Sequence, residues 1–380
     1  MLRPLRLLCA AALACASAAC SSVDRHAGLR DLATGDFAGA RAFHEALLAE
    51  EPQDEALDRN EAGVAALLQG DVAGAHVHFR EAYDELDDLS SSFGETVSGA
   101  LRAENRRWKG EPYERCMNAY YLGVTYWLQG DVDNAAACFK AGLLRDGDSA
   151  EGFAQSDFAL LWFLLGEAQR AAAHEDRGAA ALARAHDLVP KNPWTAPARA
   201  TEGNVVVLVE TGFGPARVPT GPHGADVTFA RRAGGAPAYR VRLGGRDLGL
   251  TAPLGDVYVQ AITRGSKVID HINEGKAVFK DAAVIGGAIV LQNSGSRTSD
   301  ALGAALILAG LLTPSQTDMR CWASLPDQVQ TLVAELPEGR STLTFEPADA
   351  AGRAGGGGAW SVPVDVARGR VTLAWTRTLD

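Results

Sequence analysis

The chain has 380 residues, a net charge of −11 and 47% hydrophobic residues. This length suits two compact domains better than one. The acidic balance argues against nucleic-acid binding, which needs basic side chains facing phosphates. The charge is also uneven, because residues 20–200 hold 30 acidic and 17 basic side chains, whereas residues 201–380 hold 17 of each. We therefore expect an acidic front part and a neutral back part of different kinds.

The first nineteen residues have the pattern of an export signal. Arg3 and Arg6 precede an apolar run, Leu7–Ala19, that ends in small residues. This run is shorter than the roughly 20 residues that a membrane-spanning helix needs, so we expect a cleavable signal over residues 1–19.

The cysteine that follows this run predicts a lipid anchor. Ser17-Ala18-Ala19-Cys20 resembles the lipobox of bacterial lipoproteins, although Ser17 replaces the usual leucine. The resemblance implies covalent diacylglycerol and acyl lipid on Cys20, with residues 20–23 as a short tether. Ser21 resembles the residue found in lipoproteins sorted to the outer membrane, which would place the protein on the periplasmic side of a Gram-negative envelope. Cys15 is a competing lipidation site, and an ordinary secretory signal cut near Ala19 is the other alternative.

Three further cysteines, Cys116, Cys138 and Cys321, remain after such processing. Cys116 and Cys138 belong to one expected helical hairpin but differ by roughly 9 Å along its axis, so we expect no disulfide between them. All three are expected to be buried, inert thiols. The chain has no CxxC motif or Cys/His cluster, and we predict no metal site and no cofactor other than the lipid.

The front part contains an internal repeat. Its three copies are aligned by the pairs Gly35-Asp36, Gly70-Asp71 and Gly130-Asp131, with Gly28, Gly63 and Gly123 seven residues before them, Ala40, Ala75 and Ala135 five residues after the paired glycine, and His44, Phe79 and Phe139 nine residues after it. This spacing resembles the tetratricopeptide repeat, in which two helices form a hairpin. A generic helical bundle with recurring Gly-Asp turns is the alternative.

Each repeated position has a packing role in such a hairpin. The glycine of the first helix is expected to meet the alanine of the second, and the aromatic residue to fill the gap toward the next hairpin. The Gly-Asp pair reverses the chain and caps the second helix. The residues predicted to carry this packing are Gly63, Ala75, Phe79, Gly123, Tyr126, Ala135 and Phe139.

The repeat domain is expected over residues 24–193, with an insert at about 86–110. A fourth unit should follow at Leu160–Pro193, with its turn at Leu165-Gly166. Stacked hairpins of this kind leave a groove that typically binds a peptide or protein. The acidity of this domain favours a basic partner. The alternative is that the charge only keeps the protein soluble.

The back part has a β pattern. After a linker at 194–203, we expect a domain over residues 204–380, with strands at 205–210, 226–231, 239–243, 329–336, 342–346, 360–366 and 371–376. The short turns between the last four predict an antiparallel sheet, as in a small sandwich. Apolar helical segments are expected at about 272–312, either packed on the sheet or as a hairpin at a membrane surface. The predicted fold class is α+β, an all-α repeat solenoid followed by a mixed domain.

No convincing catalytic set emerges from the sequence. Asp270, His271 and Glu274 lie close together but without a recognisable nucleophile, as at a solvated helix start. His76 and His78 flank Val77, an expected core residue, and suit the surface. Two further residues, Arg320 and Trp322, could form a stacked cation–π pair or a peptide-binding patch, or could cap the sandwich. We therefore predict a protein that is not an enzyme.

Three short stretches resemble a family of uncharacterised bacterial lipoproteins with a repeat-containing front half. They are residues 203–212 (GNVVVLVETG), 320–326 (RCWASLP) and 336–339 (LPEG). The resemblance implies a role in the cell envelope but no activity. We thus expect a scaffold whose acidic groove binds a periplasmic or envelope protein. The alternative is an envelope enzyme or a carbohydrate-binding module within residues 201–380.

Overall fold

A computed structural model describes residues 24–91, 107–146, 156–196, 203–220, 226–232, 234–263 and 318–379. Several predictions concern residues outside these ranges: the signal and Cys20, the segments at 272–312, and the Asp270-His271-Glu274 group. They stay predictions.

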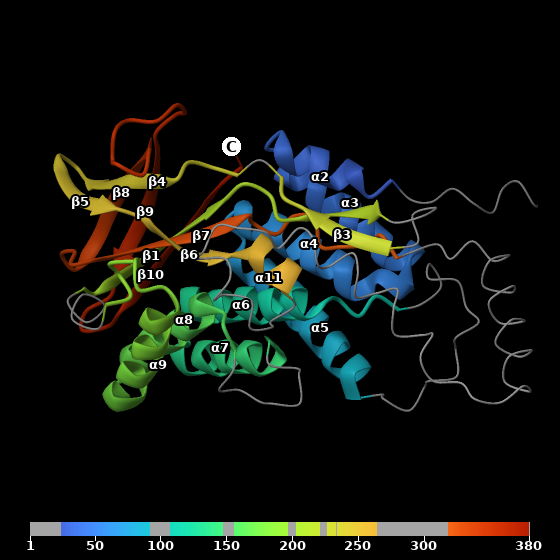
Figure 1. Ribbon diagram of the computed structural model, residues 1–380, viewed down its shortest axis with the longest axis horizontal. Coiled ribbons are helices and arrows are strands. Elements are labelled where there is room, and N and C mark those ends of the chain that lie inside the picture. Colours follow the sequence, from blue (N-terminus) through green and yellow to red (C-terminus); the bar gives the residue numbers. More distant parts are fainter. Residues whose placement is uncertain are drawn as a thin grey trace, which may run out of the picture.

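The described front part consists of helical hairpins in sequence order (Figure 1). The hairpins are α2 (His26–Ala33) with α3 (Phe37–Glu50), α4 (Glu55–Leu68) with α5 (Val72–Ser91), α6 (Pro112–Leu128) with α7 (Val132–Asp146), and α8 (Ala159–Ala171) with α9 (Glu175–Leu188). A short 3₁₀ helix, η1 (Pro52–Asp54), joins the first hairpin to the second. Neighbouring helices contact each other all along the row. The predicted α solenoid is therefore confirmed. None of the described helices is long and apolar enough to cross a membrane.

The Gly-Asp pairs make the first three turns. The paired glycines Gly35, Gly70 and Gly130 have φ angles of 83°, 80° and 85°. Residues with a side chain rarely adopt this left-handed backbone conformation, whereas glycine adopts it readily. The aspartate that follows each glycine accepts a hydrogen bond from the main-chain N–H three residues later, and so caps the second helix.

The fourth hairpin has a different register from the one predicted. Leu165-Gly166 lies inside α8, and the chain turns instead at Ala173, whose φ angle is 61°. Gly166 precedes Ala173 by seven residues, as Gly123 precedes Gly130. A Cβ atom on Gly166 would lie 2.6 Å from Leu182 of α9, so Gly166 is the packing glycine of this hairpin and not its turn.

The packing glycines make room for a large side chain of the same hairpin. A Cβ atom on Gly63 would lie 2.7 Å from the ring of Phe79, and one on Gly123 would lie 2.4 Å from Phe139. The ring, more than the expected alanine, fills the space above each glycine. Phe79 also stacks on Tyr121 of the next hairpin, with 4.9 Å between ring centroids. The side chain of Tyr126 is only partly buried and accepts a hydrogen bond from Arg80.

Gly123→Leu is expected to destabilise the protein by about 3 kcal/mol, because a well-packed helix pair cannot accommodate the added carbons without displacing Phe139. Urea denaturation monitored by circular dichroism measures the effect. Gly245→Leu is the matched control, since a Cβ atom there meets nothing within 4 Å. Equal unfolding midpoints for the two variants would contradict this packing.

Helix α5 buries the side that carries His78 and exposes Val77, the reverse of the prediction. His78 is buried and hydrogen-bonds to Glu45 of α3 at 3.0 Å, and burial lowers the pKa of His78. Val77, the expected core residue, is 52% exposed. The prediction of a surface His78 and a buried Val77 is therefore wrong, because α5 turns the His78 side toward α3. His76 is partly buried against Tyr126.

The described residues of the back part form two four-stranded sheets and a two-stranded ribbon. The first sheet has the order β10 (Thr372–Thr378), β1 (Val205–Thr211), β7 (Gln328–Ala334), β6 (Ala252–Asp256), and the second has the order β5 (Arg246–Leu250), β4 (Ala238–Leu243), β8 (Gly339–Ala348), β9 (Trp360–Val366). The ribbon pairs β2 (Ala216–Thr220) with β3 (Asp226–Ala230), and helix α11 (Val257–Thr263) follows β6.

The last four strands do not form the expected run of antiparallel neighbours. Only β8 and β9 pair with each other, whereas β7 and β10 belong to the first sheet. The last strand, β10, pairs parallel to β1, so this sheet is mixed. Turn spacing predicts where strands begin and end, but it does not determine which sheet each strand joins.

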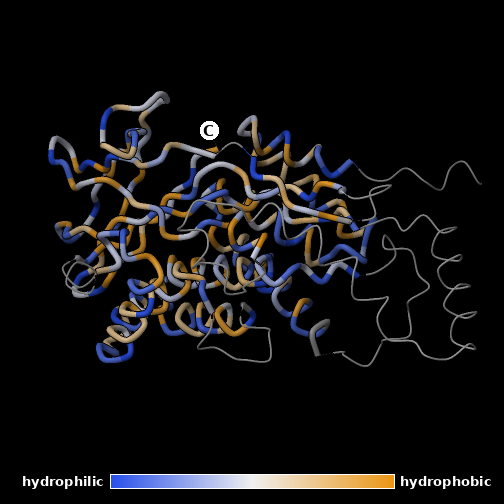
Figure 2. Tube along the Cα trace, viewed as in Figure 1, coloured by the Kyte–Doolittle hydropathy of each residue, from blue (hydrophilic) through white to orange (hydrophobic). Residues whose placement is uncertain are grey.

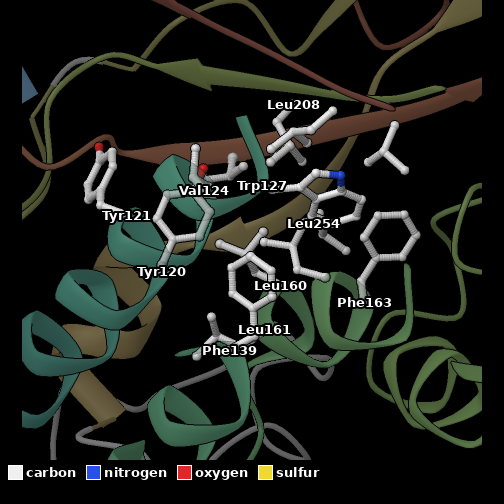
Figure 3. Packing of buried hydrophobic residues seen from close by; sticks show 14 of the residues in the cluster. Tyr120, Tyr121, Val124, Trp127, Phe139, Leu160, Leu161, Phe163, Leu208 and Leu254 are labelled. Carbon is white, nitrogen blue, oxygen red and sulfur yellow. The ribbon is translucent and has the colours of Figure 1, made fainter. Parts of the chain in front are cut away.

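One buried core runs through both parts of the chain. Figure 1 shows the first sheet lying over α6 and α8, with α7 and α9 on the far side of these helices. β1 is buried at all seven positions. Figure 3 shows Trp127 of α6 and Leu160 of α8 in one cluster with Leu208 of β1 and Leu254 of β6. The first helices of the third and fourth hairpins therefore face the sheet. In Figure 2 the most apolar segments gather where the helices and strands meet.

Candidate protein-interaction groove

The face of the repeats that is turned toward the back part carries carboxyl groups. Asp54 of η1, Asp58 and Glu61 of α4, and Glu114 of α6 are all buried. Spacings of four and three residues place the first three on one side of their helix. Asp54, Glu61 and Glu114 contact the back part, whereas Asp58 pairs with Arg25 and His44 at the first hairpin. Glu114 also belongs to a capping box with Glu111 at the start of α6. Buried carboxyl groups are costly unless they form hydrogen bonds or ion pairs, and other residues of the chain provide these partners.

A loop of the back part, which turns at residues 323–325, fills this face, and we call residues 318–325 the groove segment. Trp322 donates its main-chain N–H to Glu114 at 2.7 Å. Glu61 accepts the N–H groups of Ala323 at 2.7 Å and Ser324 at 3.2 Å. Three consecutive N–H groups are thus held by two carboxylates from neighbouring hairpins.

The side chain of Trp322 lies in an aromatic pocket of the repeats. It is 0% exposed, and its ring centroid lies 5.6 Å from that of Tyr121 and 6.2 Å from that of Phe79. Its indole N–H donates to Ser324 at 3.0 Å. In this structure the indole packs between two hairpins and does not face solvent, so Trp322 contacts the repeats and is not open to a partner.

Arg320 is held by charge and does not stack on Trp322. Its guanidinium pairs with Asp54 and, at 2.6 Å, with Asp318. Asp54 also pairs with Arg25, the residue before α2, at 2.6 Å. Burial raises the pKa of Asp54, and the two arginines oppose that effect. Asp54 therefore links the first hairpin, the second hairpin and the groove segment.

Arginines of the back part cover the outer side of the groove segment. Arg217 of β2 donates to the carbonyl of Asp318 at 2.8 Å and forms an ion pair with Glu111. Arg232, after β3, donates to the carbonyl of Ala323 at 2.9 Å. The groove segment thus lies between the acidic repeats and a basic side of the β2–β3 ribbon.

A second polar cluster joins α6 to the first sheet. Glu210 of β1 accepts hydrogen bonds from the hydroxyls of Tyr120 and Tyr121, at 2.8 and 2.7 Å, and from the indole of Trp375 at 2.8 Å. Arg377, its register neighbour on β10, lies 3.5 Å from its carboxylate. Burial raises the pKa of Glu210, and the positive charge of Arg377 opposes this rise. A lone charge in the apolar run 205–210 was the available signal for this cluster in the sequence.

Two carboxyl groups of the repeats have a pKa near neutrality. Burial raises the pKa of Glu114 to about 7, against the effect of Arg217, and raises that of Glu167 in α8 to about 7, against the effect of Arg170. In the unfolded chain both would have their ordinary value of 4.5. The folded state therefore binds more protons between these values, and it loses stability as pH rises from about 4.5 through 7.

Glu167→Gln is expected to remove the part of this pH-dependent loss of stability that comes from Glu167. Between pH 4.5 and 8, wild type should lose about 3 kcal/mol relative to this variant, since one pKa unit corresponds to about 1.4 kcal/mol. Urea denaturation of both proteins across this range measures the difference. The comparison cancels the opposite contribution of histidines such as His78, whose lowered pKa disfavours the folded state as pH falls below 6.5. A constant difference between the two proteins would contradict the raised pKa.

Two adjoining hollows have volumes of about 250 and 370 Å³; the first lies between Trp194 and the back part, and the second lies where α8 and α9 meet the back part. Trp194, at the start of the predicted linker, lines the first and is itself largely buried. The remaining lining is mostly charged side chains and main chain, with Gly203 and Glu335 shared by both hollows. Among the residues described, no cluster of His, Cys, Asp and Glu could hold a metal ion. The thiol of Cys116 donates a hydrogen bond to the carbonyl of Gly142 at 3.2 Å, and burial raises the pKa of Cys138 to about 12 and of Cys321 to about 11.

No protein-family model and no curated protein matches the chain. Among solved structures, MamA is similar at 13% identity and a TM-score of 0.32, over 43% of this chain and 74% of that one. BtubC (BKLC) from P. vanneervenii is similar at 19% identity and a TM-score of 0.31, over 41% and 58%. The Cut9-Hcn1 hetero-tetramer of the APC/C is similar at 18% identity and a TM-score of 0.24, over 46% and 35%. At these scores the repeat assignment rests on the hairpins described above.

Proposed function

We propose that the protein is a lipid-anchored scaffold of the cell envelope that recruits a basic protein partner through its acidic repeats. One observation carries the proposal. The repeats already hold an arginine-containing loop of the chain, using carboxylates for its N–H groups and an aromatic pocket for its tryptophan. Stacked hairpins commonly use this face for peptides, and carboxylates favour basic ones.

A pull-down from bacterial envelope extract tests the recruitment. The bait is the full chain after the signal, because the two parts share one core. We expect one protein to be recovered at low salt and lost at high salt. Neutralising three exposed acids of the repeats, Asp133, Glu175 and Asp176, should weaken its recovery.

The matched control neutralises three exposed acids of the back part, Glu335, Glu338 and Asp365, which changes the net charge by the same amount. Recovery of the partner should survive this change. Equal recovery by both variants, or recovery that does not depend on salt, would overturn the role of the acidic repeats.

Cys20→Ala is expected to release the protein from membranes, because the lipid on Cys20 would be its anchor. Fractionation of cells grown with labelled palmitate measures both attachment and lipid incorporation. Cys15→Ala is the control and should leave both unchanged. Continued labelling of Cys20→Ala, with loss of labelling in Cys15→Ala, would assign the anchor to Cys15.

A further inference from the structure

The groove separates contacts that any peptide could make from contacts that select a sequence. Glu61 and Glu114 accept main-chain N–H groups, which every residue except proline offers. Selection falls on two side chains of the segment, Arg320 at Asp54 and Trp322 in its pocket. Peptide-binding grooves share this division, in which main-chain bonds give affinity and side-chain pockets give specificity.

The groove segment has a defined end. Asp327 donates its main-chain N–H to the carbonyl of Thr211, and β7 begins directly after it at Gln328. The contacts with Asp54, Glu61 and Glu114 all come from residues 320–324, before Pro326. Exchange of the segment would therefore leave the pairing of β7 with β1 and β6 in place.

We propose that this groove also binds a peptide segment of a partner protein, which turns after its tryptophan as the groove segment does, in exchange for the groove segment. The peptide carries an arginine two residues before a tryptophan, with free main-chain N–H groups at the tryptophan and the two residues after it. This inference rests on the proposed function and names the chemistry of the partner. Because the groove segment is part of the same chain, it competes with the partner's peptide at a high effective concentration. Without a partner, the groove segment therefore occupies the groove.

Removing the side chain of Trp322 from its pocket makes the exchange of the groove segment for a peptide measurable. The full chain with Trp322→Ala keeps the groove carboxylates and vacates the space beside Tyr121 and Phe79. The probe is a fluorescent synthetic peptide with the sequence of residues 318–326, in which serine replaces the cysteine. By fluorescence anisotropy we expect it to bind the Trp322→Ala protein at least tenfold more tightly than wild type. Peptides with alanine for the tryptophan, or glutamate for the arginine, should lose at least tenfold in affinity.

Circular dichroism shows whether the Trp322→Ala protein is folded. If it is not, the peptide is expected to restore its helical signal and its cooperative melt, whereas the alanine peptide should not. A second variant, Arg320→Ala, loosens the segment but leaves the indole in place, and it should bind the peptide more tightly than wild type.

The inference is overturned if the folded variants bind none of the peptides or bind all of them equally. It is also overturned if an unfolded Trp322→Ala protein gains nothing from the peptide and Arg320→Ala fails to bind it. Either result would leave the salt-dependent pull-down unaffected, so failure here is distinguishable from failure of the proposed scaffold. In that case the segment would be a fixed part of the core, and a partner would bind elsewhere on the repeats.

Discussion

Arg377→Met is expected to lower the free energy of unfolding by about 3–5 kcal/mol, because it leaves the buried carboxylate of Glu210 without its cation. Arg377 also donates to the carbonyls of Gly212 and Leu325, at 3.0 and 3.2 Å, and these acceptors would lose a partner too. Chemical denaturation of the full chain measures the loss. The effect should be larger at pH 8 than at pH 5, since Glu210 without Arg377 would have a still higher pKa and would accept a proton in acid.

Two controls assign this effect to the buried charge. Arg353→Met removes an arginine whose side chain is 82% exposed and which pairs with the nearby Asp349, so it should change stability by about 0.5 kcal/mol or less. Adding Glu210→Gln to Arg377→Met removes the unpaired charge and should recover part of the loss. A double variant that loses the full sum of the two single losses would contradict a coupled pair.

The repeats were predictable from the sequence because their signals are local. Gly35, Gly70 and Gly130 have left-handed backbone, and the aspartate that follows each of them caps the next helix. The fourth turn was missed because Ala173 occupies the position where the other hairpins have glycine. The spacing from Gly166 to Leu182 repeats that from Gly123 to Phe139, so a search for the packing positions and not the turn would have found it.

The acidic face of the groove could be predicted from the sequence, but the segment that occupies it could not. Periodicity places Asp54, Asp58 and Glu61 on one face, and composition makes that face acidic, but neither names its occupant. The contacts of Glu61 with Ala323 and of Glu114 with Trp322 join residues more than 200 positions apart. Glu210 likewise finds Tyr120 and Tyr121 about 90 residues away. Such pairings arise from how the sheet docks on the helices, which no local pattern encodes, so the sequence did not place Trp322 against the repeats.

Residues 24–200 without the rest of the chain are expected not to form a stable, soluble domain. The side chains of α6 and α8 that meet β1 would face water, as would the pocket of Phe79 and Tyr121 that holds Trp322. Each large apolar side chain left exposed forfeits about 1.5–3 kcal/mol, so a few of them match the whole stability of a typical domain. Glu61 and Glu114 would also lose the N–H groups they accept.

Expression of this fragment alone should give aggregated protein, or protein without a cooperative thermal transition, whereas co-expression with residues 201–380 should give a soluble complex that melts cooperatively. Replacing Trp322 by alanine in the second fragment should weaken that complex, and replacing the exposed Met319 should not. A fragment 24–200 that melts cooperatively by itself would show that the repeats fold without the sheet. The shared core would then be a docking interface between two independent domains, and release of the groove segment would need no loss of structure in the repeats.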